Sequence, residues 1–335
     1  MVKIALITPW KVKCGIASYS EALSKALAEK GVDVYIVRLP RFGKKSDPIF
    51  GQVVNKIPVS DVDLIHISHE YGLFNGHEAP FYNGLKRLGK PIVSTMHAVG
   101  NLGIDRAVAD SSDKMIVHNQ FCKKRLRFDS EVIPHGCKPS ETMPRGEAKR
   151  RIGIDERIPL VGYCGFISHY KGLETLIEAV SKIPKSALLM GGGWHAGPET
   201  HYIATLNQMT QSLLPHNCKW LGFVPDDELS MAYGAMDVVV YPSVYATESG
   251  ALLMALSHGK AVIANRLPPF REKEKLGALT TFRGVNSLVK KIRKVLRNDE
   301  YRASLEAGAR VYAEEHSWSK VAEQHIDLYE ELLAS

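Results

Sequence analysis

The stretch DVVVYPSVYATESGALLMALSHGKAVIAN, residues 237–265, indicates the fold class most directly. The apolar, β-branched run DVVVYP is typical of a buried strand, and GALLMALSH is typical of a buried helix. The pair Gly259-Lys260 ends that helix, and AVIAN forms a second apolar run. This order predicts two parallel strands that are joined by a crossover helix.

The same alternation of short apolar runs and helical patterns continues along the chain. In the first part, strands are expected at KIALIT, VDVYIV, DLIHIS, PIVST, KMIVH and EVIPH, and helices at 18–30, 78–88 and 119–126. In the second part, strands are expected at PLVGYCG, SALLMGG, CKWLGFV, DVVVYPS, KAVIAN and ALTTF, and helices near 172–182, 200–213, 227–234, 249–258, 284–297 and 299–315. Two such series predict two doubly wound α/β domains in succession.

The domain boundary is expected in the charged segment PRGEAKRRIGIDERIP, residues 144–159, which lacks apolar periodicity. A chain of 335 residues is also long for a single core. The expected domains are therefore 1–155 and 156–316. An amphipathic closing helix at 317–335 is assigned to the first.

The net charge of +7 is confined to residues 1–140, and the remainder is balanced. The basic residues concentrate in RFGKK (41–45), LKRLGK (85–90) and CKKRLR (122–127). They form either solvated helix faces or a surface for an anionic acceptor or acidic lipid headgroups. Nucleic acid is not expected, because no aromatic residues interleave with the basic ones.

Several features indicate the class and location of the protein. No apolar run reaches about 18 residues, so no membrane-spanning helix is expected. The five cysteines form no CxxC pair, and no disulfide framework or zinc site is indicated. Asp61 and Asp63 precede a strand rather than follow one, so no metal site is expected there. We expect a cytoplasmic protein, with peripheral membrane contact as an alternative.

Ligands of doubly wound domains bind at the carboxyl ends of the strands, here in a cleft that both sheets face. In the first domain, Gly15 and Ile16 lie before a helix whose amides suit an anion, although the glycine serves equally in a turn. His97 follows PIVST and is either a site residue or a structural histidine. The segment His69, Glu70 and Tyr71 follows another strand and is a candidate lining for an acceptor pocket.

In the second domain, Lys171 precedes a helix start, where a cation indicates either a bound anion or simple solvent exposure. Glu248 lies beside the free amides of the next helix. It either caps that helix or binds sugar hydroxyls beside amides that hold phosphate. The loop GGGWHAG (191–197) loosely resembles a dinucleotide fingerprint, but no acidic residue follows at the required distance.

These motifs, in this order, resemble those of retaining glycosyltransferases of family 4, which have the GT-B fold. The segments that carry the resemblance are CGIASYSEALSKALAEKGVDVYIV, EVIPHG, GFISHYKGLETLIEAV, LGFVPDDELSMAYGAMDVVVYPS and HSWSKVAEQHIDLYEELL. HEYGLF, residues 69–74, is similar to the sequence that one subset of the family has after the same strand. The resemblance implies a transferase that moves a sugar from a nucleoside diphosphate sugar to an acceptor hydroxyl, with no cofactor or metal.

The resemblance also implies roles for individual residues. His97, Lys171 and Glu248 would be the catalytic residues, contacting the reacting centre, the diphosphate and the sugar hydroxyls respectively. Residues 69–71 would face the acceptor. The donor-binding residues would be Gly15, Ile16, Val224, Ser249, Gly250, Ala251, Leu252 and Leu253.

Two positions depart from the family pattern. Phe166 stands where the family usually has an arginine, and Met254 stands where it usually has a ribose-binding glutamate. Ser168, His169 and Arg266 are candidates to replace the arginine. These departures keep open the alternative of a nucleotide-sugar-binding protein with little or no transferase activity. A GT-B epimerase or phosphorylase is a further alternative.

Overall fold

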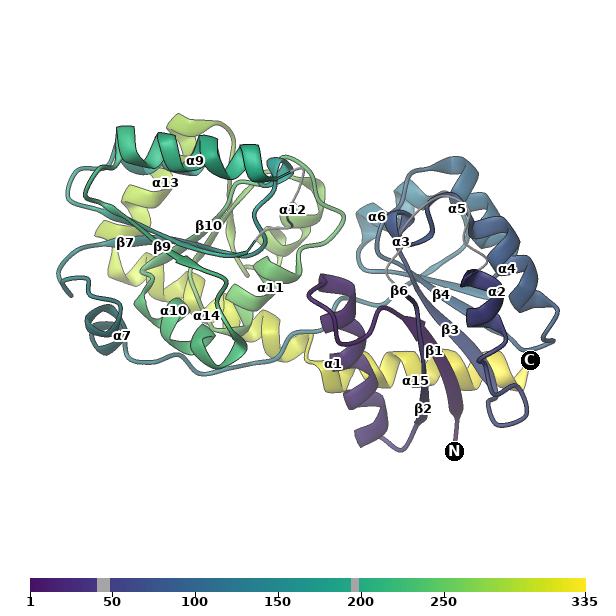
Figure 1. The fold of residues 1–335 in the computed structure, drawn as a ribbon. Helices are drawn as coiled ribbons and strands as arrows, with labels where there is room; N and C mark the ends of the chain where they lie inside the picture. Colours follow the sequence, from purple (N-terminus) through teal and green to yellow (C-terminus); the bar gives the residue numbers. More distant parts are fainter. Residues whose placement is uncertain (41–48, 194–198) are drawn as a thin grey trace. The chain divides into compact units, whose positions relative to one another are not determined.

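The computed structural model describes residues 1–40, 49–193 and 199–335. The chain forms two compact units: unit 1 comprises Met1–Gly136 and His316–Ser335, and unit 2 comprises Cys137–Glu315. Each unit contains one sheet with surrounding helices (Figure 1). The expected boundary segment 144–159 belongs to unit 2 and contains α7 (Arg145–Arg151). The basic segment RFGKK and residues 194–197 of the glycine-rich loop lie outside the described residues.

The sheet of unit 1 has parallel strands in the order β2-β1-β3-β4-β5-β6. The strands are β1 (Lys3–Thr8), β2 (Asp33–Arg38), β3 (Leu64–His69), β4 (Ile92–Met96), β5 (Lys114–Val117) and β6 (Glu131–Val132). Successive side chains of a strand point to opposite faces. Ile4 and Leu6 therefore join one apolar cluster, whereas Ala5 and Ile7 join the other.

Helices cover both faces of this sheet. On the face of Ile4 and Leu6, α1 (Gly15–Glu29) and α15 (Trp318–Ala334) pack side by side (Figure 1). The other helices of the unit are α2 (Ile49–Val54), α3 (Tyr71–Phe74), α4 (Glu78–Lys86), α5 (Leu102–Ala109) and α6 (Gln120–Leu126). Because α15 completes the core of unit 1, the expected packing of the closing helix on the first domain is confirmed.

Unit 2 has a second parallel sheet, in the order β12-β11-β10-β7-β8-β9. Its strands are β7 (Leu160–Cys164), β8 (Ala187–Gly191), β9 (Cys218–Gly222), β10 (Val238–Tyr241), β11 (Val262–Asn265) and β12 (Thr280–Phe282). Its helices are α7, α8 (Leu173–Ser181), α9 (Thr200–Leu213), α10 (Leu229–Ala235), α11 (Gly250–Ser257), α12 (Pro268–Lys275), α13 (Val285–Arg297) and α14 (Asp299–Glu315), with short 3-10 turns η1 (His169–Lys171) and η2 (Asp226–Glu228).

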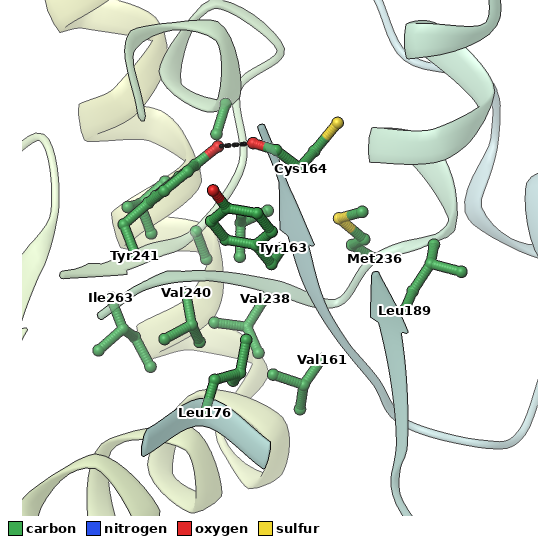
Figure 2. Packing of buried hydrophobic residues seen from close by; sticks show 14 of the residues in the cluster. Val161, Tyr163, Cys164, Leu176, Leu189, Met236, Val238, Val240, Tyr241 and Ile263 are labelled. Carbon is green, nitrogen blue, oxygen red and sulfur yellow. Dashed lines mark hydrogen bonds between the residues drawn. The ribbon is translucent and has the colours of Figure 1, made fainter. Parts of the chain in front are cut away.

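Two buried tyrosines tie the central strands of unit 2 to α11. The rings of Tyr163 and Tyr241 meet edge to face, with centroids 5.6 Å apart. The Tyr241 hydroxyl donates to the Cys164 carbonyl oxygen (Figure 2). The two oxygens are 3.0 Å apart, and the Ala251 carbonyl oxygen lies 2.5 Å from the same hydroxyl. Buried hydroxyls need such partners. The packing therefore fixes the start of α11 against the ends of β7 and β10.

The expected fold class, two doubly wound parallel α/β units, is confirmed. Each expected strand is present, although EVIPH forms only the two residues of β6. The first helix begins at Gly15 rather than at residue 18. The helices α2, α3, α5, α7 and α12 were not predicted. In α12 the prolines 268 and 269 occupy the first turn, where proline is tolerated. Because proline usually breaks a helix, these two residues did not suggest the start of one.

Candidate functional site

In unit 2 the order of the strands reverses beside β7. The chain places β8 and β9 on one side of β7, and β10, β11 and β12 on the other. Doubly wound sheets bind ligands at the carboxyl ends of their strands, at such a reversal. The loops that follow β7 and β10 contain Lys171 and Glu248. The topology therefore brings these two candidate residues to the same edge of the sheet.

The loop that carries Lys171 lies directly against the loop after β10. Gly172 has a φ of 61°, and a Cβ atom there would lie 2.8 Å from the Pro242 carbonyl oxygen. The Val244 N–H donates to the Tyr170 carbonyl oxygen at 2.8 Å. Lys171 itself is buried, and its Nζ lies 4.6 Å from the centroid of the Tyr170 ring. Glycine is thus required at 172 by both conformation and space.

Two hydrogen bonds orient the Glu248 carboxylate. Oε1 accepts the N–H of Ser249 at 2.8 Å, and Oε2 accepts from Lys273 Nζ at 2.7 Å. The side chains of Glu248 and Lys273 are only 7% and 3% exposed. A buried charge is tolerated only with a partner. Lys273, from α12, therefore holds the Glu248 carboxylate in one orientation.

The surroundings keep Lys273 charged. Burial disfavours the charged form of Lys273, but the adjacent Glu248 carboxylate and Tyr312 outweigh it, and the pKa of Lys273 is raised. For the phenol of Tyr312 and the thiol of Cys137, burial has the opposite effect on the pKa. It raises the pKa of Tyr312 above its ordinary value and that of Cys137 to about 12. The neighbouring phenol and thiol therefore stay neutral near pH 7, and the ammonium and carboxylate neutralise one another.

The first turn of α11 offers fewer amides than expected. The N–H of Ser249 is bound by Glu248, that of Leu252 by the Ser249 hydroxyl at 3.3 Å, and that of Leu253 by the Ser249 carbonyl at 3.0 Å. Among the described residues, no internal acceptor is recorded for the amides of Gly250 and Ala251. Those two are the amides that a bound anion would use.

The other donor-side candidates lie at the ends of neighbouring strands. Val224 is buried just after β9, and a Cβ atom on Gly191 would lie 3.0 Å from it. Phe166 is half-buried, and its carbonyl oxygen accepts from the Tyr163 hydroxyl at 2.7 Å. Met254 packs against the apolar core of unit 2. Met254 therefore fills apolar space, and neither Phe166 nor Met254 supplies an alternative charge.

Of the three residues named as substitutes for the missing arginine, His169 and Arg266 are exposed. The His169 ring lies 3.2 Å from the Glu199 carboxylate. Arg266 is exposed, and its backbone N–H donates to Phe282 and Asn265. Ser168 is half-buried beside η1.

In unit 1 the strand order reverses between β1 and β3. Thr8, Ser20 and Ser68 join the ends of these strands to α1 through hydroxyl contacts of 2.6 and 2.9 Å. Gly15 begins α1 and is exposed, and no atom lies within 4 Å of a Cβ built there. Ile16, the next residue, is half-buried. Space beside Gly15 thus remains for a ligand to approach the backbone.

His97 lies at the end of β4 in a cluster of rings. Its Nδ1 is 3.2 Å from Nε2 of His118, and its ring meets Tyr19 edge to face at 4.7 Å. His135 and Trp318 also pack against Tyr19. Burial, and then the neighbouring histidines, hold the pKa of His97 well below its usual range. The imidazole is therefore neutral at pH 7.

The segment 69–71 is built into the structure of unit 1. His69 is fully buried, stacks on Phe74, and has Nε2 3.7 Å from Oε1 of the buried Glu78. Glu70 caps α3 through its carboxylate. The Tyr71 hydroxyl donates to Asp105 at 2.5 Å. These residues support the loop that follows β4.

Three residues of these clusters were not predicted from sequence. His118 and His135 are the last residues of the expected strands KMIVH and EVIPH, so a signal similar to the one that indicated His97 was available for both. Lys273 lies in PPFREKEK among other charged residues, where nothing local distinguishes it. Only the fold shows that it is buried against Glu248.

In the part of the chain that the structure describes, no three His, Cys, Asp or Glu side chains are grouped to hold a metal ion. Within the same residues, no helix has both the length and the apolar character needed to cross a membrane.

The comparisons with solved structures identify the fold. Sucrose-phosphate synthase from Thermosynechococcus elongatus superposes with a TM-score of 0.81 at 20% identity, over 100% of both chains. HepE from Anabaena, solved in complex with UDP-glucose, superposes with a TM-score of 0.80 at 18% identity, also over 100% of both. The chain thus has the GT-B fold of glycosyltransferases.

Sequence comparison identifies the family. The model of glycosyl transferases group 1 matches residues 144–312, and the chain belongs to this family. It is 25% identical to D-inositol 3-phosphate glycosyltransferase of Corynebacterium jeikeium over 68% of this chain, and 31% identical to sulfoquinovosyl transferase SQD2 of Arabidopsis thaliana over 48%. The chain spans 59% of the length of the first relative and 31% of that of the second.

Proposed function

We propose that the protein is a retaining glycosyltransferase of family 4, which moves a sugar from a nucleoside diphosphate sugar to an acceptor hydroxyl on a glycan, a lipid-linked molecule or a small molecule. One observation carries the proposal. The loops after β7 and β10 lie against each other at the strand reversal of unit 2, with Lys171 on one and Glu248 on the other. A cation, two amides and an oriented carboxylate at one edge suit a diphosphate bonded to a sugar.

In this proposal, each donor-side residue has a distinct role. Lys171 and the amides of Gly250 and Ala251 stabilise the charge that develops on the departing diphosphate. Glu248, oriented by Lys273, accepts hydrogen bonds from the sugar hydroxyls. The backbone beside Val224 contacts the base.

Unit 1 would supply the acceptor side. The backbone of Gly15 and Ile16 approaches the diphosphate, and neutral His97 contacts the sugar at the reacting centre. Unit 1, which includes the closing helix, would form the acceptor domain, and unit 2 would form the donor domain. HepE, which has the same fold, was solved with UDP-glucose, and this supports a nucleotide sugar as the donor.

A second candidate function is a nucleotide-sugar-binding protein with little or no transferase activity. Phe166 and Met254 favour it, since neither replaces the charge or the hydrogen bond of the usual residue. The loss of one preorganised donor commonly lowers turnover by about 10²–10³-fold. Binding would survive such a loss better than catalysis.

The test is a panel of UDP-, GDP- and ADP-sugars, with binding and nucleotide release followed separately. We expect one donor to bind and to be hydrolysed slowly. Lys171→Met should reduce release by about 10²–10³-fold. Lys182→Met, which changes an exposed lysine on the neighbouring turn after α8, should leave release unchanged. Binding without release, even with acceptors present, would favour the second candidate. If no donor binds, both candidates fail.

A further inference from the structure

A basic cavity lies in unit 1 where β4 and β5 end. It has a volume of about 420 Å³ and is lined by Gly100, Leu102, Phe121, Lys124, Arg125 and Arg127. Three of these residues are cationic, and they come from CKKRLR, the basic segment that the sequence singles out. The volume falls within the usual range for small-molecule sites, about 300–1,000 Å³.

The cationic side chains of the cavity take part in none of the ion pairs recorded for the described part of the chain. Within residues 1–40, 49–193 and 199–335, none of the recorded ion pairs includes Lys124, Arg125 or Arg127. The buried carboxylate of Asp105 is close in sequence to the cavity wall. Its two oxygens accept from the Tyr71 hydroxyl and from the Gly100 N–H, at 2.5 and 2.8 Å. Within the described residues, three cations therefore share one cavity and none of them has a recorded ion-pair partner.

The wall of the cavity is held in place on two sides. Arg125 Nε donates to the Val99 carbonyl oxygen at 3.2 Å, which fixes the guanidinium beside the loop. Gly100 has a φ of 111°, and a Cβ atom there would collide with that guanidinium. From the other side, the Tyr71 hydroxyl accepts the Asn101 N–H at 3.0 Å. The loop is therefore preorganised, which lowers the entropy cost of binding.

The lining also indicates the kind of anion that fits. Arginine guanidinium groups bind phosphate oxygens with two parallel hydrogen bonds, and lysine adds a point charge. Leu102, 52% exposed, and Phe121 supply apolar surface for the carbon skeleton that carries the phosphate. A small phosphomonoester satisfies both parts of the cavity. A bare apolar ligand would leave the three cations uncompensated.

We propose that this cavity binds a phosphate group of the acceptor, so that the acceptor is a phosphomonoester, either a free small molecule or a lipid headgroup. The inference rests on the proposed function, in which His97 contacts the reacting centre. Gly100 follows His97 by three residues, a span of at most about 11 Å. An acceptor anchored by its phosphate here would thus present a hydroxyl near that histidine.

The first experiment titrates the full chain with inorganic phosphate by calorimetry. Lys124→Gln and Arg125→Gln should each weaken binding by about tenfold or more, the effect of one charge-assisted hydrogen bond. Lys123→Gln is the matched control, because it removes the same charge from the same helix at a residue that does not line the cavity. Leu102→Glu leaves the recorded hydrogen bonds intact and should also weaken binding, by repulsion.

The outcomes separate this inference from the proposed function. If phosphate does not bind at millimolar concentration, or if Lys123→Gln weakens it as much as Lys124→Gln does, the cavity assignment is overturned. Nucleotide binding, measured on the same variants, should be unchanged. If the wild-type protein binds phosphate in the cavity but no nucleotide, the site stands and the proposed function fails. Vesicles of phosphatidylcholine with phosphatidic acid distinguish the sources: binding that depends on Lys124 but not on Lys123 identifies a lipid headgroup.

Discussion

Replacing Lys273 by methionine should destabilise unit 2 strongly. The substitution keeps an apolar stem of similar length but removes the ammonium group that lies 2.7 Å from Glu248. Because the two side chains are 3% and 7% exposed, the remaining carboxylate would be left with little access to water. Breaking a buried ion pair in this way costs about 3–5 kcal/mol.

An ion pair on the surface with the same distance between nitrogen and oxygen provides the control. Lys182 Nζ and Glu178 Oε1 are also 2.7 Å apart, but their side chains are 45% and 47% exposed. Exposed pairs contribute at most about 1 kcal/mol, so Lys182→Met should change the free energy of unfolding little. The comparison holds the distance constant and varies only burial.

Hydrogen exchange measured by mass spectrometry is the suitable assay, because it reports each unit separately in a chain that need not unfold in one step. In Lys273→Met, amides of α11 and β11 should exchange faster by roughly two to three and a half powers of ten. Amides of β1 in unit 1 should be unaffected. The double variant Glu248→Gln/Lys273→Met should recover most of the loss, because it leaves no unpaired charge. If Lys273→Met costs no more than Lys182→Met, the account of a buried, oriented Glu248 is wrong.

Three further perturbations test other parts of the structure. Gly172→Ala should lower stability by about 1–3 kcal/mol in thermal melting, because φ is 61° and the Pro242 carbonyl oxygen lies 2.8 Å from the new Cβ atom. Gly51→Ala is the control and should not lower stability, because no atom lies within 4 Å of a Cβ built there. Burial lowers the pKa of His325 to about 4, so the unfolded chain binds this proton at a higher pH than the folded chain does. His325 alone should therefore lower the stability of unit 1 by up to roughly 3 kcal/mol as the pH falls from 6.5 to 4. His325→Leu should make that fall smaller in urea titrations at each pH. Tyr71→Phe should cost about 1–3 kcal/mol, as Asp105 loses a donor, whereas Tyr35→Phe, at an exposed residue, should melt like the wild type.

The sequence was sufficient to predict which loops carry the candidate site. Lys171 and Glu248 follow apolar strands, and strand ends are where doubly wound sheets bind ligands, so both could be chosen from one sequence. His97 followed from the same rule. The rule also covered His118 and His135, but a single sequence does not say which histidines share a cluster, because that depends on the order of strands in the sheet.

The sequence alone determined the two parallel sheets, since runs of β-branched residues and amphipathic helices are local patterns that each segment carries by itself. It also determined the basic character of the first part of the chain. The tertiary structure decided which side chains contact one another. Lys273 meets Glu248, and Tyr71 meets Asp105, across 25 and 34 residues of sequence. Long charged side chains show no periodicity that predicts such pairing, and only packing determines which of them lose water and must therefore find a counter-charge.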